Sequence, residues 1–514
     1  MLNPKSRATP PTEQDREIFD ALVPDDHYLR RTAKAIDFER FRPLMAERYS
    51  PDQGRPAIDP VVLLKIEFLQ YHDRLSDANV IAQAEVNVAY REFLGLGLGN
   101  DLPDPSSLSY FRGRLGVESH QRIFEDVLSQ AREQGLVKDR LRLKDATHVI
   151  ADVAIPTATG LVAAMRERLL EALHPYDAER VDGERGRVEM IRLADAGASA
   201  EQRLESRVVH LREVVNWAEG LYEQLQAGSA EQDVSRARLR QMLDLAHKVL
   251  QDQADPKAGD RLVSLQDSDA RFGSHHGFYC GYLLDITMDA QSELITAVNV
   301  LAANGDEAAD AATLIRQEED AQGNKVEAIS ADAALFQGEK LRELTDPEGL
   351  DLEVFTPPKK TKPTAFFPVE DFSHDAQTET LTCPAGQETS KRVRNPSSSG
   401  WMYRFPRATC AACPLRQKCL EKLPKTAGRS VTINDYTAEY EAARLKAQTP
   451  EYAEVQKIHR KVERKLNEMV RWHDGRRARV RGHPKVLVQE LLIATVVNIK
   501  RIVQQLRAKL APQA

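Results

Sequence analysis

Apolar and polar residues alternate with a period of two through residues 139–153 (DRLRLKDATHVIADV), a pattern that predicts a β-strand. We expect the strand to be half-buried. Its apolar face would hold Asp145 with Leu141, Leu143, Thr147 and Val149, and its other face Arg142, Lys144, His148 and Asp152. An isolated ionised carboxylate on a buried face is costly, so Asp145 needs a partner. A bound cation, a buried arginine and backbone amides all remain open.

A helical spacing of apolar residues precedes this strand and predicts an all-α, helix-turn-helix-like domain at 27–137. Breaks at glycine and proline separate the expected helices, at 61–72, 77–95 and 106–116. The polar residues 1–26 are expected to form a flexible tail.

In the third of these helices, Asp104 or Ser106 can cap the N-terminus. Arg112 and Arg114 are expected on its exposed side, where a phosphate backbone could be contacted. An ordinary helical domain with solvated arginines is the alternative interpretation.

Long helical patterns also follow the strand and predict a helical insertion at 161–263. One apolar stripe in it consists of Leu204, Val208, Leu211, Val215, Ala218, Leu221 and Leu225. A scaffold is the simplest role for such a stripe, which can equally contact a partner subunit or DNA.

Strand patterns return after this insertion. The elements expected in order are a hairpin, a helix and two more strands, at 281–289 with 292–302, 306–320, 325–335 and 351–357. Asp332 ends the apolar run of a strand that looks buried and parallel. Because open α/β sheets bind ligands at the carboxyl ends of their strands, Asp332 is a second candidate acid.

A Cys-containing insertion is expected at 358–450. It holds four of the five cysteines of the chain, Cys383, Cys410, Cys413 and Cys419. Four thiolates can hold a tetrahedral zinc ion, although only one pair has C-x-x-C spacing; reduced cysteines without a metal are the alternative. Cys280 stands apart and is expected in the core.

The segment 451–514 begins with a helix whose apolar stripe consists of Val455, Ile458, Val462, Leu466 and Met469. At about 100° per residue, Glu463 lies at the edge of this stripe beside His459 and Val470. Glu454 and Glu468 point away from it. Glu463 is therefore the acid of this helix that we expect to face the body of the protein.

The net charge of the chain is −7, but between residues 457 and 485 there are 11 lysines and arginines against 3 acids. Such a patch suits a phosphate backbone, and a solvated basic face is the alternative. The candidate DNA contacts in the patch are Arg460, Arg471, Arg476, Arg477, Arg479, Arg481 and Lys485.

No stretch approaches the roughly 20 apolar residues of a membrane span, and the N-terminus lacks the apolar core of a signal peptide. The clustered cysteines do not resemble the disulfide framework of a secreted protein. We expect a cytoplasmic protein with no membrane partner.

Three acids are thus candidates for one site, namely Asp145, Asp332 and Glu463. Converging at one sheet edge, they would repel each other unless cations lay among them, and two Mg²⁺ ions about 3.5–4 Å apart are the known solution. The expected fold class is α/β. An RNase H-like mixed sheet with helices would be interrupted by the two insertions and preceded by the all-α domain, its core lying at 138–160, 264–357 and 451–514.

Over nearly its whole length the chain resembles a DDE transposase of the bacterial insertion-sequence type. The likeness rests on DPSSLSYFRGRL, LKDATHVIAD, DSDARFGSHHGFYCGYLLDITMD, ADAAL, CPAG with CAACPLRQKC, and RKVERKLNEMVRWHDGRRARVRGHPKV. It implies that Asp145, Asp332 and Glu463 are the DDE triad, holding two Mg²⁺ or Mn²⁺ ions. It also implies hydrolysis at the ends of a mobile element, strand transfer into target DNA, end recognition by the N-terminal domain and a synaptic homodimer.

Two features depart from the wider superfamily. Gln456 and His459 stand where a Tyr and an Arg are frequent, and Val470 stands where a Lys is, although Arg460 and Arg471 lie one residue away. The segment ADAAL lacks the frequent Gly-Tyr after its Asp. Two other functions remain open, a catalytically inactive or domesticated transposase that only binds DNA and an RNase H-like nuclease without strand transfer.

Overall fold

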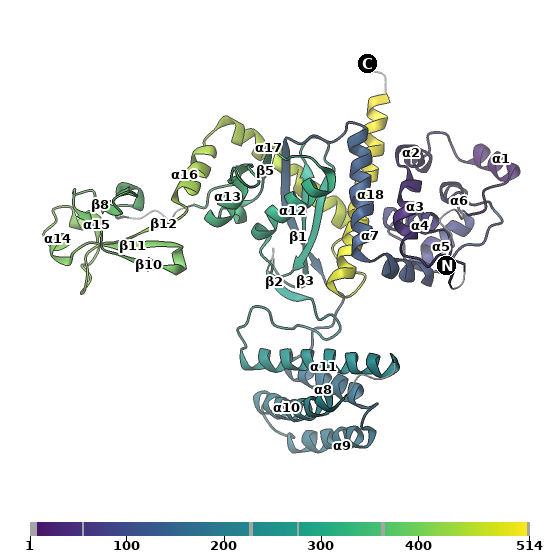
Figure 1. The fold of residues 1–514 in the computed structure, drawn as a ribbon, viewed down its shortest axis with the longest axis horizontal. Coiled ribbons are helices and arrows are strands. Elements are labelled where there is room, and N and C mark those ends of the chain that lie inside the picture. The colour runs from purple at the N-terminus through teal and green to yellow at the C-terminus, as the bar shows by residue number, and fades with distance from the viewer. Residues whose placement is uncertain (1–7, 54–55, 226–229, 275–276, 361–364, 511–514) are drawn as a thin grey trace.

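A six-stranded mixed sheet lies at the centre of the computed structural model, which describes residues 8–53, 56–225, 230–274, 277–360 and 365–510 (Figure 1). Its strands are β1 (Leu141–Ile150), β2 (Arg271–Ser274), β3 (Phe278–Asp289), β4 (Ile295–Ala302), β5 (Ala328–Ser330) and β6 (Glu353–Phe355). β1 is antiparallel to β3 and parallel to β5, which in turn is parallel to β6. β2 and β4 both pair antiparallel with β3, so the predicted strands and hairpin are confirmed.

Three helices pack on this sheet, α12 (Glu307–Gln322), α17 (Pro450–Trp472) and α18 (His483–Leu510), and α7 (Ser106–Glu133) packs against α18. α17 lies on β1, α12 on β3 and β4, and α18 between β4 and α7. One apolar core joins the sheet to α17, α18 and the N-terminal helices. Among the residues whose positions are described, no helix combines the length and apolar character that a membrane crossing requires.

Strand β1 is buried on both faces, so the prediction of a half-buried strand is wrong. Arg142 and Lys144, expected on an open face, are 0% and 4% exposed. Lys144 Nζ lies 2.7 Å from Asp285 Oδ2 on β3. The period-two pattern identifies the strand, but it cannot identify the distant acids that allow its charged residues to be buried.

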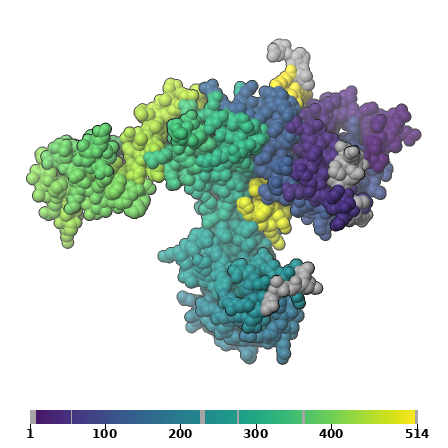
Figure 2. Space-filling model, viewed as in Figure 1, coloured from purple at the N-terminus to yellow at the C-terminus, as the bar shows by residue number. Residues whose placement is uncertain are grey.

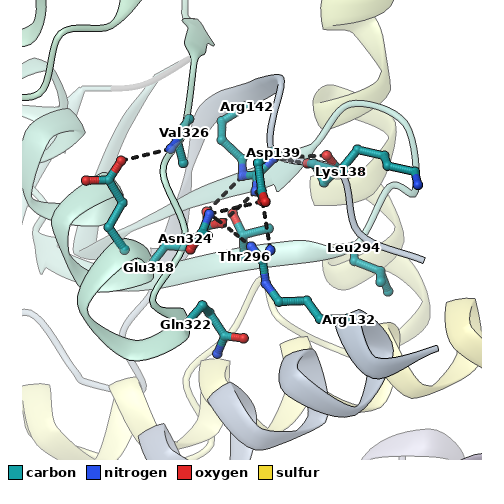
Figure 3. A network of polar contacts seen from close by, with 12 residues as sticks. Arg132, Lys138, Asp139, Arg142, Leu294, Thr296, Glu318, Gln322, Asn324 and Val326 are labelled. Atoms are coloured by element: carbon teal, nitrogen blue, oxygen red, sulfur yellow. Dashed lines mark hydrogen bonds and ion pairs between the residues drawn. The ribbon is translucent and has the colours of Figure 1, made fainter. Parts of the chain in front are cut away.

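A network of polar contacts surrounds Arg142 (Figure 3). Its guanidinium lies 2.6 Å and 2.8 Å from the two carboxylate oxygens of Glu318 on α12, and 2.9 Å from Asp289 Oδ1 at the end of β3. Arg132 of α7 lies 2.9 Å from the same Glu318 and 2.8 Å from Asp139. Burial raises the pKa of Glu318, but hydrogen bonds and the charge of Arg142 outweigh burial and hold that pKa below its usual value.

The N-terminal part is an all-α bundle, as predicted. Before α7 its helices are α1 (Glu13–Leu22), α2 (Tyr28–Ala35), η1 (Phe38–Phe41), α3 (Arg42–Ala46), α4 (Pro60–His72), α5 (Asp77–Val86) and α6 (Val88–Leu94). The helix expected at 77–95 is broken at Asn87, whose side chain accepts a hydrogen bond from the Tyr90 amide and caps α6. α7 extends past the expected end at Gly116, where it is kinked with φ 62°.

The prediction of a flexible tail at 1–26 is wrong for helix α1, while residues 1–7 lie outside the described ranges. Thr12 and Asp15 form a capping box, in which each side chain accepts a hydrogen bond from the backbone amide of the other. Phe19 is buried. A local cap and one buried aromatic residue order a segment whose composition resembles a tail.

Four helices form a separate bundle below the sheet in Figure 1, namely α8 (Ala158–Leu173), α9 (Ala178–Ala194), α10 (Ala200–Gln224) and α11 (Ala230–Ala254). The bundle has its own apolar core. From the predicted stripe, Leu211, Val215 and Ala218 are buried in it.

The Cys-containing segment forms a lobe at the left of Figure 2. It has two three-stranded sheets, β7 (Ser373–Asp375), β8 (Thr380–Thr382) and β9 (Glu388–Thr389), and β10 (Arg392–Asn395), β11 (Gly400–Arg404) and β12 (Ser430–Asn434). The short helices of the lobe are η3 (Val369–Asp371), η4 (Pro396–Ser398), α14 (Arg407–Ala411) and α15 (Arg416–Cys419). Towards the sheet lie η2 (Ala333–Leu335), α13 (Gly338–Thr345) and α16 (Thr437–Lys446).

We predict that Arg142→Met destabilises the protein by about 3–5 kcal/mol, because it leaves Glu318 and Asp289 buried without their main cation. Urea denaturation measures the loss. The matched control is Arg316→Met, which removes an exposed pair with Glu343 at 3.1 Å and should cost about 1 kcal/mol or less. Equal losses in the two variants would contradict the central role of Arg142.

Candidate active site

The pairing of β1 with β5 brings two candidate acids together. Leu143 pairs with Ser330 in the parallel register. Two residues farther along each chain are Asp145 and Asp332, so the same register carries both carboxylates to neighbouring positions at the end of β5. Asp332 caps η2, its Oδ1 accepting a hydrogen bond of 2.9 Å from the Ala334 amide. The expectation that Asp332 follows a parallel strand is confirmed.

Glu463 comes from α17, which crosses β1, β5 and β6. Val455, Val462, Leu466 and Met469 of the predicted stripe are buried, and Ile458 is half-buried. We expected Glu463 to face the body of the protein, but the structure leaves this residue exposed.

Glu468, expected to point away from the protein, is half-buried between Lys465 at 2.9 Å and Lys500 at 3.5 Å. Burial opposes the shift, but these lysines hold the pKa of Glu468 below its usual value. A helical projection could not identify Lys500, which belongs to α18.

Electrostatics link the three acids. Burial is the largest cause that raises the pKa of Asp145, and the charges of Asp332 and Glu463 add to it. A hydrogen bond of 2.9 Å from the Ala146 amide and the charge of Lys144 oppose the rise, and the resulting pKa is about 7. Of the partners that the sequence left open, a backbone amide is thus present. Among the ion pairs of the described residues, none involves Asp145.

A hard divalent cation fits the chemistry of these donors. Carboxylate oxygens are the ligands Mg²⁺ prefers, and a cation would offset the repulsion that raises the pKa of Asp145. As the side chains stand, however, no group of three His, Cys, Asp or Glu residues in the described ranges is close enough to hold an ion. Binding would therefore need side-chain rotation at Asp332 and Glu463, both of which are exposed.

His459 is a buried residue at this site to which the sequence assigned no role. It lies one turn before Glu463, and its Nδ1 is 3.1 Å from Ser330 Oγ on β5. Burial lowers the pKa of His459, whereas the charges of Glu463 and Asp332 raise it. In the sequence, the only indication of a special role was that His459 stands where the wider superfamily frequently has an Arg.

The predicted DNA contacts divide into two groups. Arg112 is wrongly predicted to be exposed, because it is held 2.5 Å from Asp77 and 3.6 Å from the buried Glu67. Arg476 is half-buried and donates hydrogen bonds to Thr147 Oγ1 and the His148 carbonyl. Arg479 and Arg481 are exposed, but they are paired with Asp474 and Asp152.

The other predicted contacts are exposed. They are Arg114, Arg460, Arg471, Arg477 and Lys485. Arg114 stacks over Tyr49, with its guanidinium carbon 4.3 Å from the ring centre.

The four clustered cysteines line one small pocket together, beside Phe405 and Arg429. Cys410 Sγ accepts a hydrogen bond of 3.3 Å from the Arg429 amide. Four thiols around one pocket and an amide directed at one of them fit a tetrahedral zinc ion in donor chemistry. As the side chains stand, however, no three of these cysteines are close enough together to hold an ion. Cys280 is buried on β3, as expected, and burial raises the pKa of its thiol to about 11.

Comparison with known protein families gives two matches. Residues 17–114 match a transposase domain (DUF772), and residues 382–503 match a transposase DDE domain. Together they support an insertion-sequence DDE transposase. Glu463 and the four clustered cysteines lie in the second range, whereas Asp145 and Asp332 lie outside both. No curated protein and no solved structure matches the chain.

We predict that replacing Asp145 by Asn changes how stability depends on pH. Its folded-state pKa of about 7 lies above the usual 3.8, so the folded protein retains this proton longer than the unfolded chain does. The contribution of Asp145 to stability is therefore lost as pH rises from about 4 to about 7. Thermal denaturation should show the stability of Asp145→Asn rising relative to that of the wild type between about pH 4 and pH 7. Above this window the difference between the two proteins should stay constant.

The control is Glu454→Gln, which alters an exposed acid of α17. The stability difference between Glu454→Gln and the wild type should not change between about pH 4 and pH 7 in this way. An Asp145→Asn difference that is constant from pH 4 to pH 8 would contradict the assigned environment of Asp145.

Proposed function

We propose that the protein binds the terminal inverted repeats of its insertion sequence, cleaves the DNA by two-metal-ion phosphodiester hydrolysis and transfers the 3′ ends into target DNA. In this proposal Asp145, Asp332 and Glu463 are the metal-binding catalytic acids. The observation that carries it is the β1–β5 register, which aligns Asp145 with Asp332. The transposase matches supply the reaction class.

The strand order supports an RNase H-like core. Along one path the sheet runs β4, β3, β1, β5 and β6, with three antiparallel strands first and two strands parallel to β1 after them. We propose that this core is made of 138–160, 264–357 and 451–514, interrupted by insertions at 161–263 and 358–450. The separate apolar cores of the α8–α11 bundle and of the Cys-containing lobe support this division.

The chemistry assigned to each group follows from its position. When bound, two Mg²⁺ or Mn²⁺ ions would activate the attacking water or 3′-hydroxyl and stabilise the leaving oxygen. Asp145 lies deepest and is fixed on the central strand, whereas Asp332 and Glu463 are exposed and can rotate towards it. Arg476 donates hydrogen bonds to Thr147 and His148, just past Asp145 on β1. We propose that its guanidinium would stabilise negative charge on the phosphate that is cleaved there.

DNA would approach over basic residues that the fold leaves exposed. In the C-terminal segment these are Arg460, Arg471, Arg477, Arg479, Arg481 and Lys485, and Arg114 presents a further cation on the N-terminal bundle. We propose a homodimer in the synaptic complex, because two element ends must be joined in one event. A zinc ion on Cys383, Cys410, Cys413 and Cys419 would hold the small lobe together.

Cleavage of a duplex carrying the flanking repeats of the element tests the function directly. With Mg²⁺ or Mn²⁺, we expect the wild type to cut at the repeat tip, and Asp145→Asn, Asp332→Asn and Glu463→Gln each to lose about a thousandfold in rate, since each removes a metal ligand. The exposed Glu454→Gln on the same helix is the matched control and should cut normally.

Each other result has a distinct meaning. Binding of the repeats without cleavage by the wild type would support a non-catalytic DNA-binding protein. Cleavage without joining to target DNA would support a nuclease, and normal cleavage by Asp332→Asn would remove Asp332 from the triad.

We also predict about one zinc ion per chain in the purified protein, measured by elemental analysis. Cys410→Ser should lose most of it, because the zinc would have only three thiolates left. Cys280→Ser is the control, since Cys280 is buried on β3 away from the lobe, and it should retain the zinc. A wild type purified without chelators that holds no zinc would contradict the site.

A further inference from the structure

The hydrogen bond between His459 and Ser330 joins two of the three proposed metal-binding elements. Ser330 is the last residue of β5 and is 0% exposed, and His459 on α17 is 8% exposed. The bond of 3.1 Å therefore lies inside the protein, where it is strong and orients both partners. A serine hydroxyl both donates and accepts, so either tautomer of the histidine can form the bond.

Apolar contacts alone would define the position of α17 on the sheet less precisely than apolar contacts together with a hydrogen bond. The other residues of its buried stripe that pack on the sheet, such as Val455 and Val462, make non-directional contacts, which constrain the position of a helix along its axis only weakly. A hydrogen bond has a required distance and direction, so it defines one axial position. The His459–Ser330 bond supplies such a fixed point.

Both chains advance by a similar length from this point to their acids. Glu463 is four residues after His459, about 6 Å along a helix. Asp332 is two residues after Ser330, about 6.6 Å along an extended chain. The charges of both acids act on His459 and on Asp145, so both chains lead towards the same place.

We propose that His459 is a positioning residue, which through Ser330 fixes α17 on β5 so that Glu463 meets Asp332 and Asp145 around the metal ions. This inference rests on the proposed function, because it assumes that the three acids bind metal. His459 itself is not assigned a bond to DNA or to the ions. Its burial distinguishes it from Arg460, the neighbouring exposed residue that can contact phosphate.

The test compares His459→Leu, Ser330→Ala, the double variant and His459→Asn, whose amide can reach the position of the imidazole Nδ1. His374→Leu is the matched control, because it removes a histidine hydrogen bond of 2.9 Å, to Tyr403 in the Cys-containing lobe. Binding of Mn²⁺ to the full-length protein without DNA is measured by electron paramagnetic resonance of the free ion. The Mg²⁺ concentration for half-maximal cleavage is measured in parallel, and melting temperatures report on folding.

We expect His459→Leu and Ser330→Ala each to weaken Mn²⁺ binding by about tenfold or more and to raise the Mg²⁺ requirement similarly. The double variant should bind Mn²⁺ no more weakly than the single variant with the lower affinity, because each single substitution already removes the same hydrogen bond. His459→Asn should recover most of the affinity, and His374→Leu should bind Mn²⁺ as the wild type does. A purely structural role would lower the melting temperature and leave the affinity for Mn²⁺ unchanged.

Two results would overturn the positioning role while leaving the proposed function intact. They are a wild type that binds Mn²⁺ and cleaves DNA while the His459 and Ser330 variants match it, and single effects that multiply in the double variant. A wild type that neither binds Mn²⁺ nor cleaves would instead overturn the proposed function, and the positioning role with it.

Discussion

The buried ion network at Arg142 is the constraint on which the geometry of the sheet depends. One guanidinium on β1 contacts α12 through Glu318 and the end of β3 through Asp289, and Glu318 also binds Arg132 of α7. Burying such a group is costly, and well-packed apolar residues often stabilise a core as much. What the network adds is a defined position for β1 relative to three other elements.

That position determines which way Asp145 points. Side chains on a strand alternate between faces, so a slip of one residue would move Asp145 to the opposite face and away from Glu463. The same slip would separate Arg142 from Glu318 and Lys144 from Asp285, and it would leave these buried charges without contacts that stabilise them. Charges on one face of β1 therefore specify the register that the candidate site on the other face needs.

The sequence alone predicted what depends on neighbours along the chain. The alternation around Asp145 and the hairpin at 281–302 are local patterns, and the structure has strands at both. The burial of Arg142, the pairing of Arg112 and the partners of Glu468 were missed because each depends on a residue from another element. Projecting a helix shows which residues share a face, but it does not show what that face meets.

The candidate site differs from three other buried carboxylates in how its acids are compensated. Asp285, Asp289 and Glu318 each face a lysine or arginine within 3 Å. Burial nevertheless raises the pKa of Asp285 to about 8. Asp145 lies on β1 with a backbone amide and two further acids around it, and burial together with the charges of these acids raises its pKa to about 7. The unbalanced negative charge on β1 is what a site for divalent cations requires, since an internal lysine or arginine there would compete with the ions.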